Sequence, residues 1–254
     1  MNRVPFPAFR PLQFLLVIAW ALLISGCKKD HLFDCFKGTG DEHTEVRNLS
    51  GFDKVFAENN VDVDIYPGHE FKIEVTAGDK LIESITTEVT DSTLYIRNEN
   101  KCNWVRSFKN KFKVKVWMPS LAVLNSYGSG NITLKDTIVT NEFEYNNWNA
   151  SGEINLLFNT NSAHLNIHTG PGNVSLYGHV GIHYLYHNGQ GLIDARQCQT
   201  DITFTNNMGT NNIIINVTND LYAKISYIGN IYYYGNPTKF YPEVLGSGKI
   251  IKAD

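Results

Sequence analysis

Glycine returns at nearly constant intervals through the second half of this chain, and this recurrence limits the possible folds more than any other feature. From residue 130 onward a glycine stands just before a strand-like segment, and successive glycines are separated by 22, 20, 19, 18, 20 and 19 residues. The positions are Gly130, Gly152, Gly172, Gly191, Gly209, Gly229 and Gly248. A period near 20 residues is typical of a solenoid in which each repeat forms one coil.

Each repeat contains two strand-like pieces, which predicts a parallel β-helix. One piece follows the glycine directly, as in NITL and EINLL, and the other lies about eight residues before the next glycine, as in AHLNIH and TDITFTN. Glycine at the corners allows either a positive φ or a close approach between coils. Asparagine-rich corners such as Asn211-Asn212 suit left-handed backbone, and stacked amides can hydrogen-bond between coils.

The region before the repeats also alternates with period two. Val61, Val63 and Ile65 share one face of a predicted strand, and Val114, Val116 and Met118 share one face of another. No window of a dozen residues has a sustained helical period. The fold class predicted for the chain is therefore all-β, a parallel β-helix with coils of about 20 residues and short strands.

The N-terminus has the pattern of a bacterial lipoprotein signal. A basic start is followed by an apolar stretch from Phe14 to Ile24, which is about half of the ~20 residues that a spanning helix needs. The sequence LISGC then predicts cleavage before Cys27 and lipid attachment to that residue. The expected organisation is a signal peptide at 1–26, a polar tether at 27–44 and a β-helix domain at 45–254, on an outer-membrane lipoprotein facing the periplasm or the cell surface.

Three cysteines remain in the exported chain. Cys35 and Cys102 lie in irregular polar segments, so a disulfide between them is the expected pair in an oxidising compartment. Cys198 follows a strand-like segment and is expected as a small, partly buried thiol. No two cysteines have CxxC spacing, which argues against a cysteine metal site.

Histidines recur in two neighbouring repeats and suggest a metal site. With a step of 19 residues, His164 aligns with His183, which places Tyr184 and Tyr186 in the core. The same step adds Glu142 below and Asp201 above, so a metal-binding column of Glu142, His164, His183 and Asp201 is predicted on the outer face. The alternative is a set of ordinary solvent-facing polar residues.

Other chemistries have weaker signals. GSGN at 128–131 is followed by a strand and not by a helix, so a phosphate-binding loop is not expected. Glu142 and Glu144 are a pair of acids on one strand face, about 7 Å apart by strand geometry. This separation is compatible with the two carboxyl groups of a glycosidase, so that activity is kept as an alternative. The basic, aromatic segment 101–117 could bind an anionic glycan, but lysines are also common on edge strands.

The order of these elements resembles a known family. Gly51-Phe52, the PSL turn at 119–121, the serial glycine corners and the closing segment LYAKISYIGNIYYYGNP are similar to the GIN domain, over about residues 46–254. The pattern departs from the family where Ser151, Met208 and Ile228 stand beside single glycines. That family is described as an autotransporter adhesin head domain and is frequent in lipoproteins of Bacteroidetes.

The resemblance implies a β-helix with a surface role and no established activity. We therefore expect a non-catalytic, adhesin-like protein without a cofactor, attached to the membrane through its N-terminal lipid, with a glycan or a surface protein as ligand. A polysaccharide-processing enzyme and a purely structural envelope protein are the alternatives. The net charge of −3 gives no support for a nucleic-acid partner.

Overall fold

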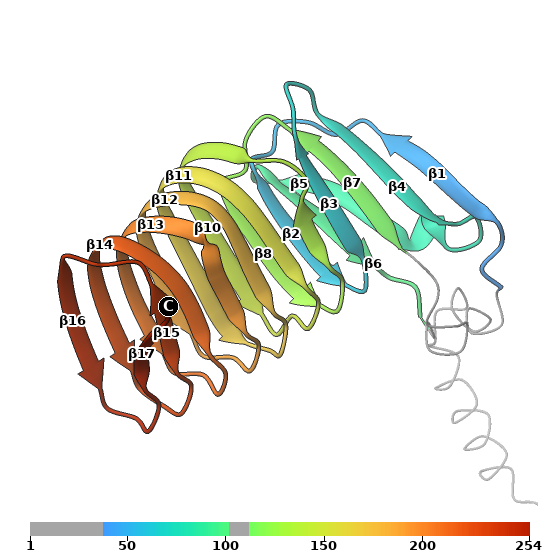
Figure 1. Ribbon diagram of the computed structural model, residues 1–254. Helices are drawn as coiled ribbons and strands as arrows, with labels where there is room; N and C mark the ends of the chain where they lie inside the picture. The colour runs from blue at the N-terminus through green and yellow to red at the C-terminus, as the bar shows by residue number, and fades with distance from the viewer. Residues whose placement is uncertain (1–37, 102–111) are drawn as a thin grey trace, which may run out of the picture.

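The computed structural model describes residues 38–101 and 112–254, and these residues form an all-β solenoid (Figure 1). Apart from one short 3-10 turn at Ile82–Ser84, the regular structure in these ranges consists of strands. In the N-terminal half they are β1 (Glu42–Arg47), β2 (Lys54–Asn59), β3 (Asp62–Pro67), β4 (Lys72–Gly78), β5 (Ile85–Thr90), β6 (Thr93–Asn98), β7 (Lys113–Met118), β8 (Val123–Gly128) and β9 (Ile132–Leu134).

The C-terminal half is a stack of parallel coils. Its strands are β10 (Ile138–Trp148), β11 (Ile154–Thr169), β12 (Val174–His187), β13 (Ile193–Asn207), β14 (Ile213–Ile225), β15 (Ile231–Tyr234), β16 (Lys239–Val244) and β17 (Ile250–Lys252). Ile154 pairs with Val174 and Ile167 with His187, so the parallel register between β11 and β12 is 20 residues. This confirms the predicted β-helix. In β11 to β14, however, the two strand pieces expected in a repeat are joined into one long strand that curves around the coil.

Each coil has two walls that enclose the core. Wall A is formed by the part of each coil that follows the glycine corner, as in 154–158 of β11, and wall B by the later part, as in 163–167. Alternate residues of both walls are buried, including Leu156 and Leu165 with no exposed surface. The residues between them face outward because strand side chains alternate. The predicted inward residues Val63, Ile65 and Val116 are likewise fully buried, as expected from the alternation.

The recurring glycines allow the coils to approach closely at the corner. A Cβ atom on Gly191 would lie 1.9 Å from the carbonyl oxygen of Gly172, and one on Gly152 would lie 2.0 Å from that of Gly130. No side chain fits in that space. The positive φ that was the other predicted reason for glycine occurs at neighbouring corner positions, with φ of +122° at Gly128 and +105° at Gly170.

Asparagine side chains link one corner to the next. The Oδ1 atom of Asn131 accepts a hydrogen bond from the backbone N–H of Glu153 at 2.8 Å, and Oδ1 of Asn173 accepts one from Leu192 at 2.9 Å. Direct amide-to-amide bonds also occur on wall B, where Asn166 donates to Asn146 at 3.0 Å. The predicted amide bonding between coils is confirmed, and it satisfies polar groups that the turns leave without a strand partner.

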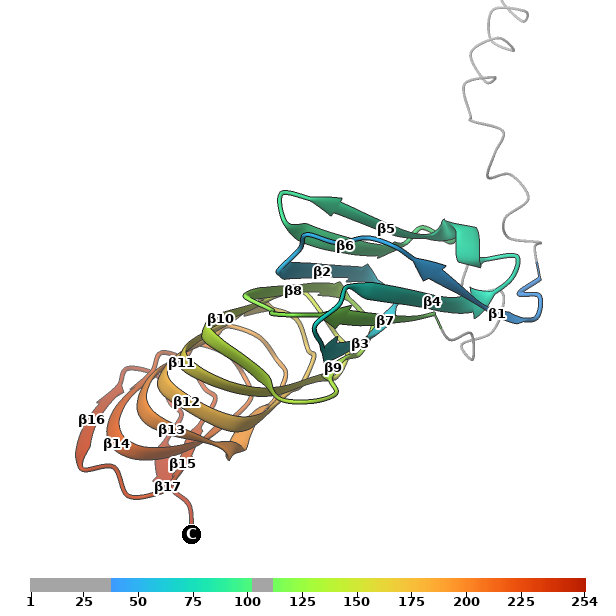
Figure 2. The ribbon, with the colours of Figure 1, turned by 90° about the horizontal axis from the view of Figure 1, so that it is seen from above.

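At the N-terminal end the parallel pattern gives way to antiparallel pairs (Figure 2). β2 and β3 pair in parallel with β8 and β9, so they belong to the solenoid. Beyond them, β4 pairs antiparallel with β7 and with β1, and β5 pairs antiparallel with β6. β1 begins at Glu42, inside the segment expected to be a tether. The added strands cover an end of the stack that would otherwise expose unpaired backbone.

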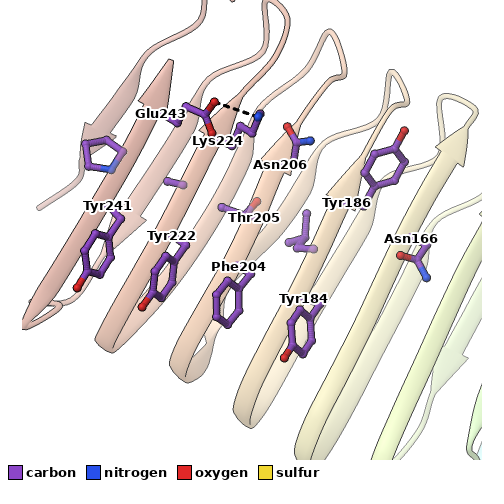
Figure 3. Close-up of a pocket in the computed structure, with 13 residues that line it drawn as sticks. Asn166, Tyr184, Tyr186, Phe204, Thr205, Asn206, Tyr222, Lys224, Tyr241 and Glu243 are labelled. Atoms are coloured by element: carbon purple, nitrogen blue, oxygen red, sulfur yellow. Dashed lines mark hydrogen bonds and ion pairs between the residues drawn. The ribbon is translucent and has the colours of Figure 1, made fainter. Parts of the chain in front are cut away.

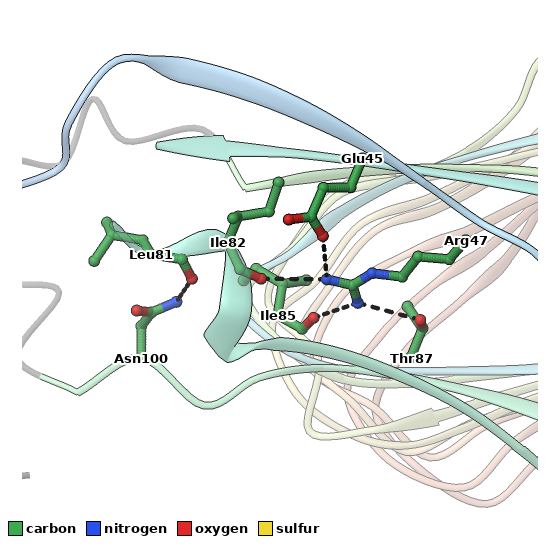
Figure 4. Close-up of polar contacts among 7 residues, drawn as sticks. All are labelled: Glu45, Arg47, Leu81, Ile82, Ile85, Thr87 and Asn100. Atoms are coloured by element: carbon green, nitrogen blue, oxygen red, sulfur yellow. Dashed lines mark hydrogen bonds and ion pairs between the residues drawn. The ribbon is translucent and has the colours of Figure 1, made fainter. Parts of the chain in front are cut away.

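Arg47 fastens the first strand to this end of the molecule (Figure 4). Its guanidinium donates to the carbonyl oxygen of Ile85 at 2.5 Å, to the Thr87 hydroxyl at 3.2 Å and to the carbonyl oxygen of Ile82 at 3.3 Å. Glu45 accepts a further bond at 3.2 Å. One side chain of β1 therefore connects to the 3-10 turn and to β5.

The C-terminal end of the core is closed by aromatic rings. Tyr233 of wall A and Phe240 of wall B lie with ring centroids 5.2 Å apart. The terminal strand β16 pairs with β14 on one side only among the described strands, and Phe240 remains 40% exposed.

Candidate functional site

The outer face of wall B carries a continuous stack of aromatic side chains, one from each coil between β11 and β16, and Figure 3 shows the part of it from Tyr184 to Tyr241. We call this set the aromatic ladder, and its members are His164, Tyr184, Phe204, Tyr222 and Tyr241. From the first pair to the last, neighbouring ring centroids lie 4.5, 5.2, 4.5 and 4.6 Å apart. The planes of successive rings differ by 16°, 8°, 12° and 11°.

The parallel register of the strands produces this stack. His164 pairs with Tyr184, Tyr184 with Phe204, and Tyr222 with Tyr241. Because neighbouring strands lie about 4.8 Å apart, side chains in register meet near the contact distance of stacked rings. Each aromatic pair contributes about 0.5–1.5 kcal/mol beyond simple burial, which stabilises the stack. The inner rings Tyr184, Phe204 and Tyr222 have another ring stacked on each face, whereas His164 and Tyr241, at the two ends, each stack on one ring.

A second outward row lies beside the ladder, two residues further along each strand. This row contains Asn166, Tyr186, Asn206, Lys224 and Glu243. Lys224 and Glu243 form an ion pair at 3.0 Å. The space between the ladder and the second row is a groove of about 520 Å³ that runs across β11 to β16. Besides the second row it is lined by Tyr184, Leu185, Phe204, Thr205, Tyr222, Ala223, Tyr241 and Pro242.

The structure shows that the predicted metal column is wrong. His164 lies next to Tyr184, Glu142 next to Ser162, and His183 next to Ala163. His183 points into the core, and Asp201 lies 3.5 Å from His179 instead. The cause is the register of 20 residues in place of the assumed 19, since a slip of one residue turns a side chain to the opposite face.

No substitute metal site appears nearby. Within residues 38–101 and 112–254, no group of three or more histidine, cysteine, aspartate or glutamate side chains is placed to hold an ion. The same register error had placed Tyr184 and Tyr186 in the core. Both face outward, and Tyr184 is 38% exposed.

The inner face of wall B is unusually polar at the coils beneath the groove. His183, His187, Thr203 and Asn207 are completely buried. His187 contacts Asn207 through Nδ1 at 3.1 Å, whereas neither ring nitrogen of His183 has a hydrogen-bond partner in the described part of the chain. Burial lowers the pKa of His183 to about 4, with a smaller contribution from His164. Both imidazoles are therefore expected to be neutral near neutral pH.

The remaining predicted sites are not part of the groove. Glu142 and Glu144 do not line it, and the Glu144 carboxylate accepts a hydrogen bond from Asn146 at 2.9 Å. Cys27, Cys35 and Cys102 lie outside the described residues, so the lipid site and the disulfide stay predictions. Cys198 is free and fully buried, and burial raises the pKa of its thiol to about 12.

The basic segment is only partly described, because residues 102–111 fall outside the described ranges. Lys113 pairs with Asp64 at 2.6 Å, and Lys115 lies 3.6 Å from Glu74. Both lysines belong to β7, which pairs with β3 on one side and β4 on the other. β7 is therefore an interior strand and not the edge strand that the lysines suggested.

Comparison with known proteins places the chain in a family. Residues 51–237 match the family model described as "Putative auto-transporter adhesin, head GIN domain". The chain belongs to this family. The match confirms the resemblance inferred from the glycine corners and the closing aromatic segment. A comparison with curated proteins finds no match.

Solved structures share the GIN domain architecture. A protein described as a "putative adhesin" from Bacteroides fragilis is 22% identical, with a TM-score of 0.77 over 84% of this chain and 97% of that one. A "putative lipid binding protein" from Parabacteroides distasonis is 23% identical, with a TM-score of 0.67 over 85% and 98%. Another "putative adhesin" from P. distasonis is 17% identical, with a TM-score of 0.69 over 85% and 98%. At these identities the likeness concerns the fold.

The description of the family supports an adhesin-like role. Within the described residues, no helix has the length and apolar character needed to cross a bilayer.

Proposed function

We propose that this protein is a non-catalytic, lipid-anchored adhesin of the bacterial outer membrane, and that wall B is its binding surface. The aromatic ladder with its adjoining groove carries the proposal. Large exposed apolar side chains are usually scattered on a soluble surface, and contiguous ones mark an interaction site. Tyrosine-rich surfaces held in fixed geometry bind with little loss of conformational entropy.

The long axis of the groove suits an extended ligand. Between β11 and β16 the aromatic ladder and the second row present one side chain each from every coil, at a spacing of about 4.8 Å. A ligand with its own repeated units can engage several of them at once. The family description and the adhesin-like neighbours support the same role.

The chemistry of the groove favours binding over catalysis. Its only charged lining residues are Lys224 and Glu243, and these neutralise one another. General acid–base cleavage of a glycan needs two carboxyl groups on either side of the bond, and the groove has one.

Cell adhesion tests the proposal. Cells that display the full chain should adhere to surfaces coated with extended polysaccharides or surface proteins. Replacing Tyr184 and Tyr222 together by serine should reduce adhesion about tenfold, because groups central to an interface dominate its energy. Tyr232→Ser is a matched control, since Tyr232 pairs with Ile214 on the other wall. Equal adhesion by cells that display the wild type, the Tyr184/Tyr222 double variant and Tyr232→Ser would refute the proposed surface.

The anchor is tested separately. Cys27→Ser should release the protein from the membrane fraction and prevent its labelling by radioactive palmitate. Membrane retention and labelling of this variant would contradict lipid attachment at Cys27.

A further inference from the structure

Tyr186 differs from the other rings that line the groove. Its neighbours in the second row are the amides Asn166 and Asn206, whereas each ladder ring stacks on at least one other ring. The ring contact found for Tyr186 within the described residues is with His168, at 6.3 Å and tilted by 51°. Among residues 38–101 and 112–254 no ring stacks on either face of Tyr186, and Figure 3 shows it between the two asparagines. An aromatic face inside the groove is therefore left for a ligand.

The two flanking amides leave complementary polar atoms unused. Asn166 donates through Nδ2 to Asn146 at 3.0 Å, so its Oδ1 acceptor stays open. Asn206 accepts through Oδ1 from the Ser226 hydroxyl at 2.9 Å, so its Nδ2 donor stays open. Within the described part of the chain neither open atom has another hydrogen-bond partner. An acceptor on one side of the ring and a donor on the other suit a hydroxylated molecule, since each hydroxyl both donates and accepts.

Charge and backbone pairing narrow the class of ligand. The ion pair between Lys224 and Glu243 leaves the groove without net charge, which gives a polyanion no electrostatic advantage. β12 and β13 are paired on both sides, so a peptide cannot join wall B here as an added strand. What remains is an uncharged molecule with an apolar face and hydroxyl groups at its rim.

From these observations we propose that Tyr186, Asn166 and Asn206 form a binding subsite for one pyranose ring of a neutral glycan. The apolar face of the sugar lies on the Tyr186 ring, and its hydroxyls bind the open atoms of the two amides. Adjoining sugars of the chain follow the groove along the edges of Phe204 and Tyr222. This assignment rests on the proposed function, because it names the ligand class of the same surface.

Binding of defined oligosaccharides tests the subsite. The full chain in detergent is titrated with neutral tetrasaccharides of glucose, mannose, galactose and xylose, with tetragalacturonate as the charged comparison, and followed by saturation-transfer NMR. At least one neutral tetrasaccharide should bind. Tyr186→Ala should weaken that binding about tenfold, Tyr186→Phe should retain it because the ring face remains, and Asn206→Leu should weaken it.

Two controls make the result decisive. Tyr232→Ala should bind like the wild type, and equal thermal midpoints should show that Tyr186→Ala is folded. No neutral binding, a preference for tetragalacturonate, or full binding by Tyr186→Ala would each overturn the subsite. If adhesion of displaying cells still depends on Tyr184 and Tyr222 in that case, the wall B surface stands and only the sugar class fails.

Discussion

The buried imidazole of His183 should make the stability of this protein depend on pH. His183 lies on the inner face of wall B between Ala163 and Thr203, with no exposed surface and no hydrogen-bond partner among the described residues. Burial, with a smaller effect from His164, lowers its pKa from 6.5 to about 4. The neutral form is therefore favoured in the folded protein.

The size of the effect follows from the two pKa values. Above about pH 6.5 neither state binds the proton, and the full stability is present. As the pH falls toward 4, the unfolded chain takes up a proton that the folded chain does not. Each pH unit in this range costs about 1.4 kcal/mol, which sums to about 3 kcal/mol at pH 4. Burial also lowers the pKa of His187, which adds in the same direction.

His183→Leu should remove this part of the pH dependence. The free energy of unfolding, measured by urea denaturation with circular dichroism, should fall less for the variant than for the wild type between about pH 7 and about pH 5. The expected difference is about 2 kcal/mol. The variant should also gain stability at pH 7, because it buries no unpaired nitrogen atoms.

An exposed histidine provides the control. His69→Leu removes an imidazole from the surface, so its stability should follow the wild-type dependence on pH. Parallel curves for His183→Leu and the wild type would show that His183 is not held neutral by burial, and would refute the reasoning.

Three further predictions concern stability and reactivity. Gly191→Ala should destabilise the protein by more than about 2 kcal/mol, because its Cβ would lie 1.9 Å from a carbonyl oxygen. Gly38→Ala is the control, since its Cβ would meet nothing within 4 Å. Equal thermal midpoints for the two variants would contradict this prediction. Cys198 should resist iodoacetamide in the native protein and react after unfolding, as peptide mass spectrometry can measure, and rapid native labelling would disprove its burial. Arg47→Met should lower the free energy of unfolding by about 1–3 kcal/mol. The exposed Arg196→Met should have a smaller effect, and a reversed order would contradict the proposed role of Arg47.

The architecture of the repeats could be predicted from the sequence because its cause is local. A corner that admits no Cβ must be glycine wherever coils touch, so the period is visible as Gly130, Gly152 and their successors. Inward residues such as Val63 and Val116 could be assigned by counting in steps of two. The antiparallel strands at the N-terminal end have the same alternation as parallel ones, and their partners therefore could not be assigned.

The aromatic ladder could not be predicted, although all its rings are in the printed sequence. Tyr184, Phe204, Tyr222 and Tyr241 are separated by 20, 18 and 19 residues. These steps are uneven because the pairing shifts between coils, for example between Asp194 and Gln199. If a constant period is assumed, the predicted row is wrong by one or two residues after a single coil.

The sequence by itself determined that this chain coils with a period near 20 residues and which residues turn its corners. Only the tertiary structure decided which side chains share a row and whether they face the core or the solvent. The physical reason is the alternation of strands, since an error of one residue in register exchanges the two faces. With the observed register of 20 residues in place of the predicted 19, His183 lies in the core, and Tyr184 and Tyr186 lie on the surface that we propose for binding.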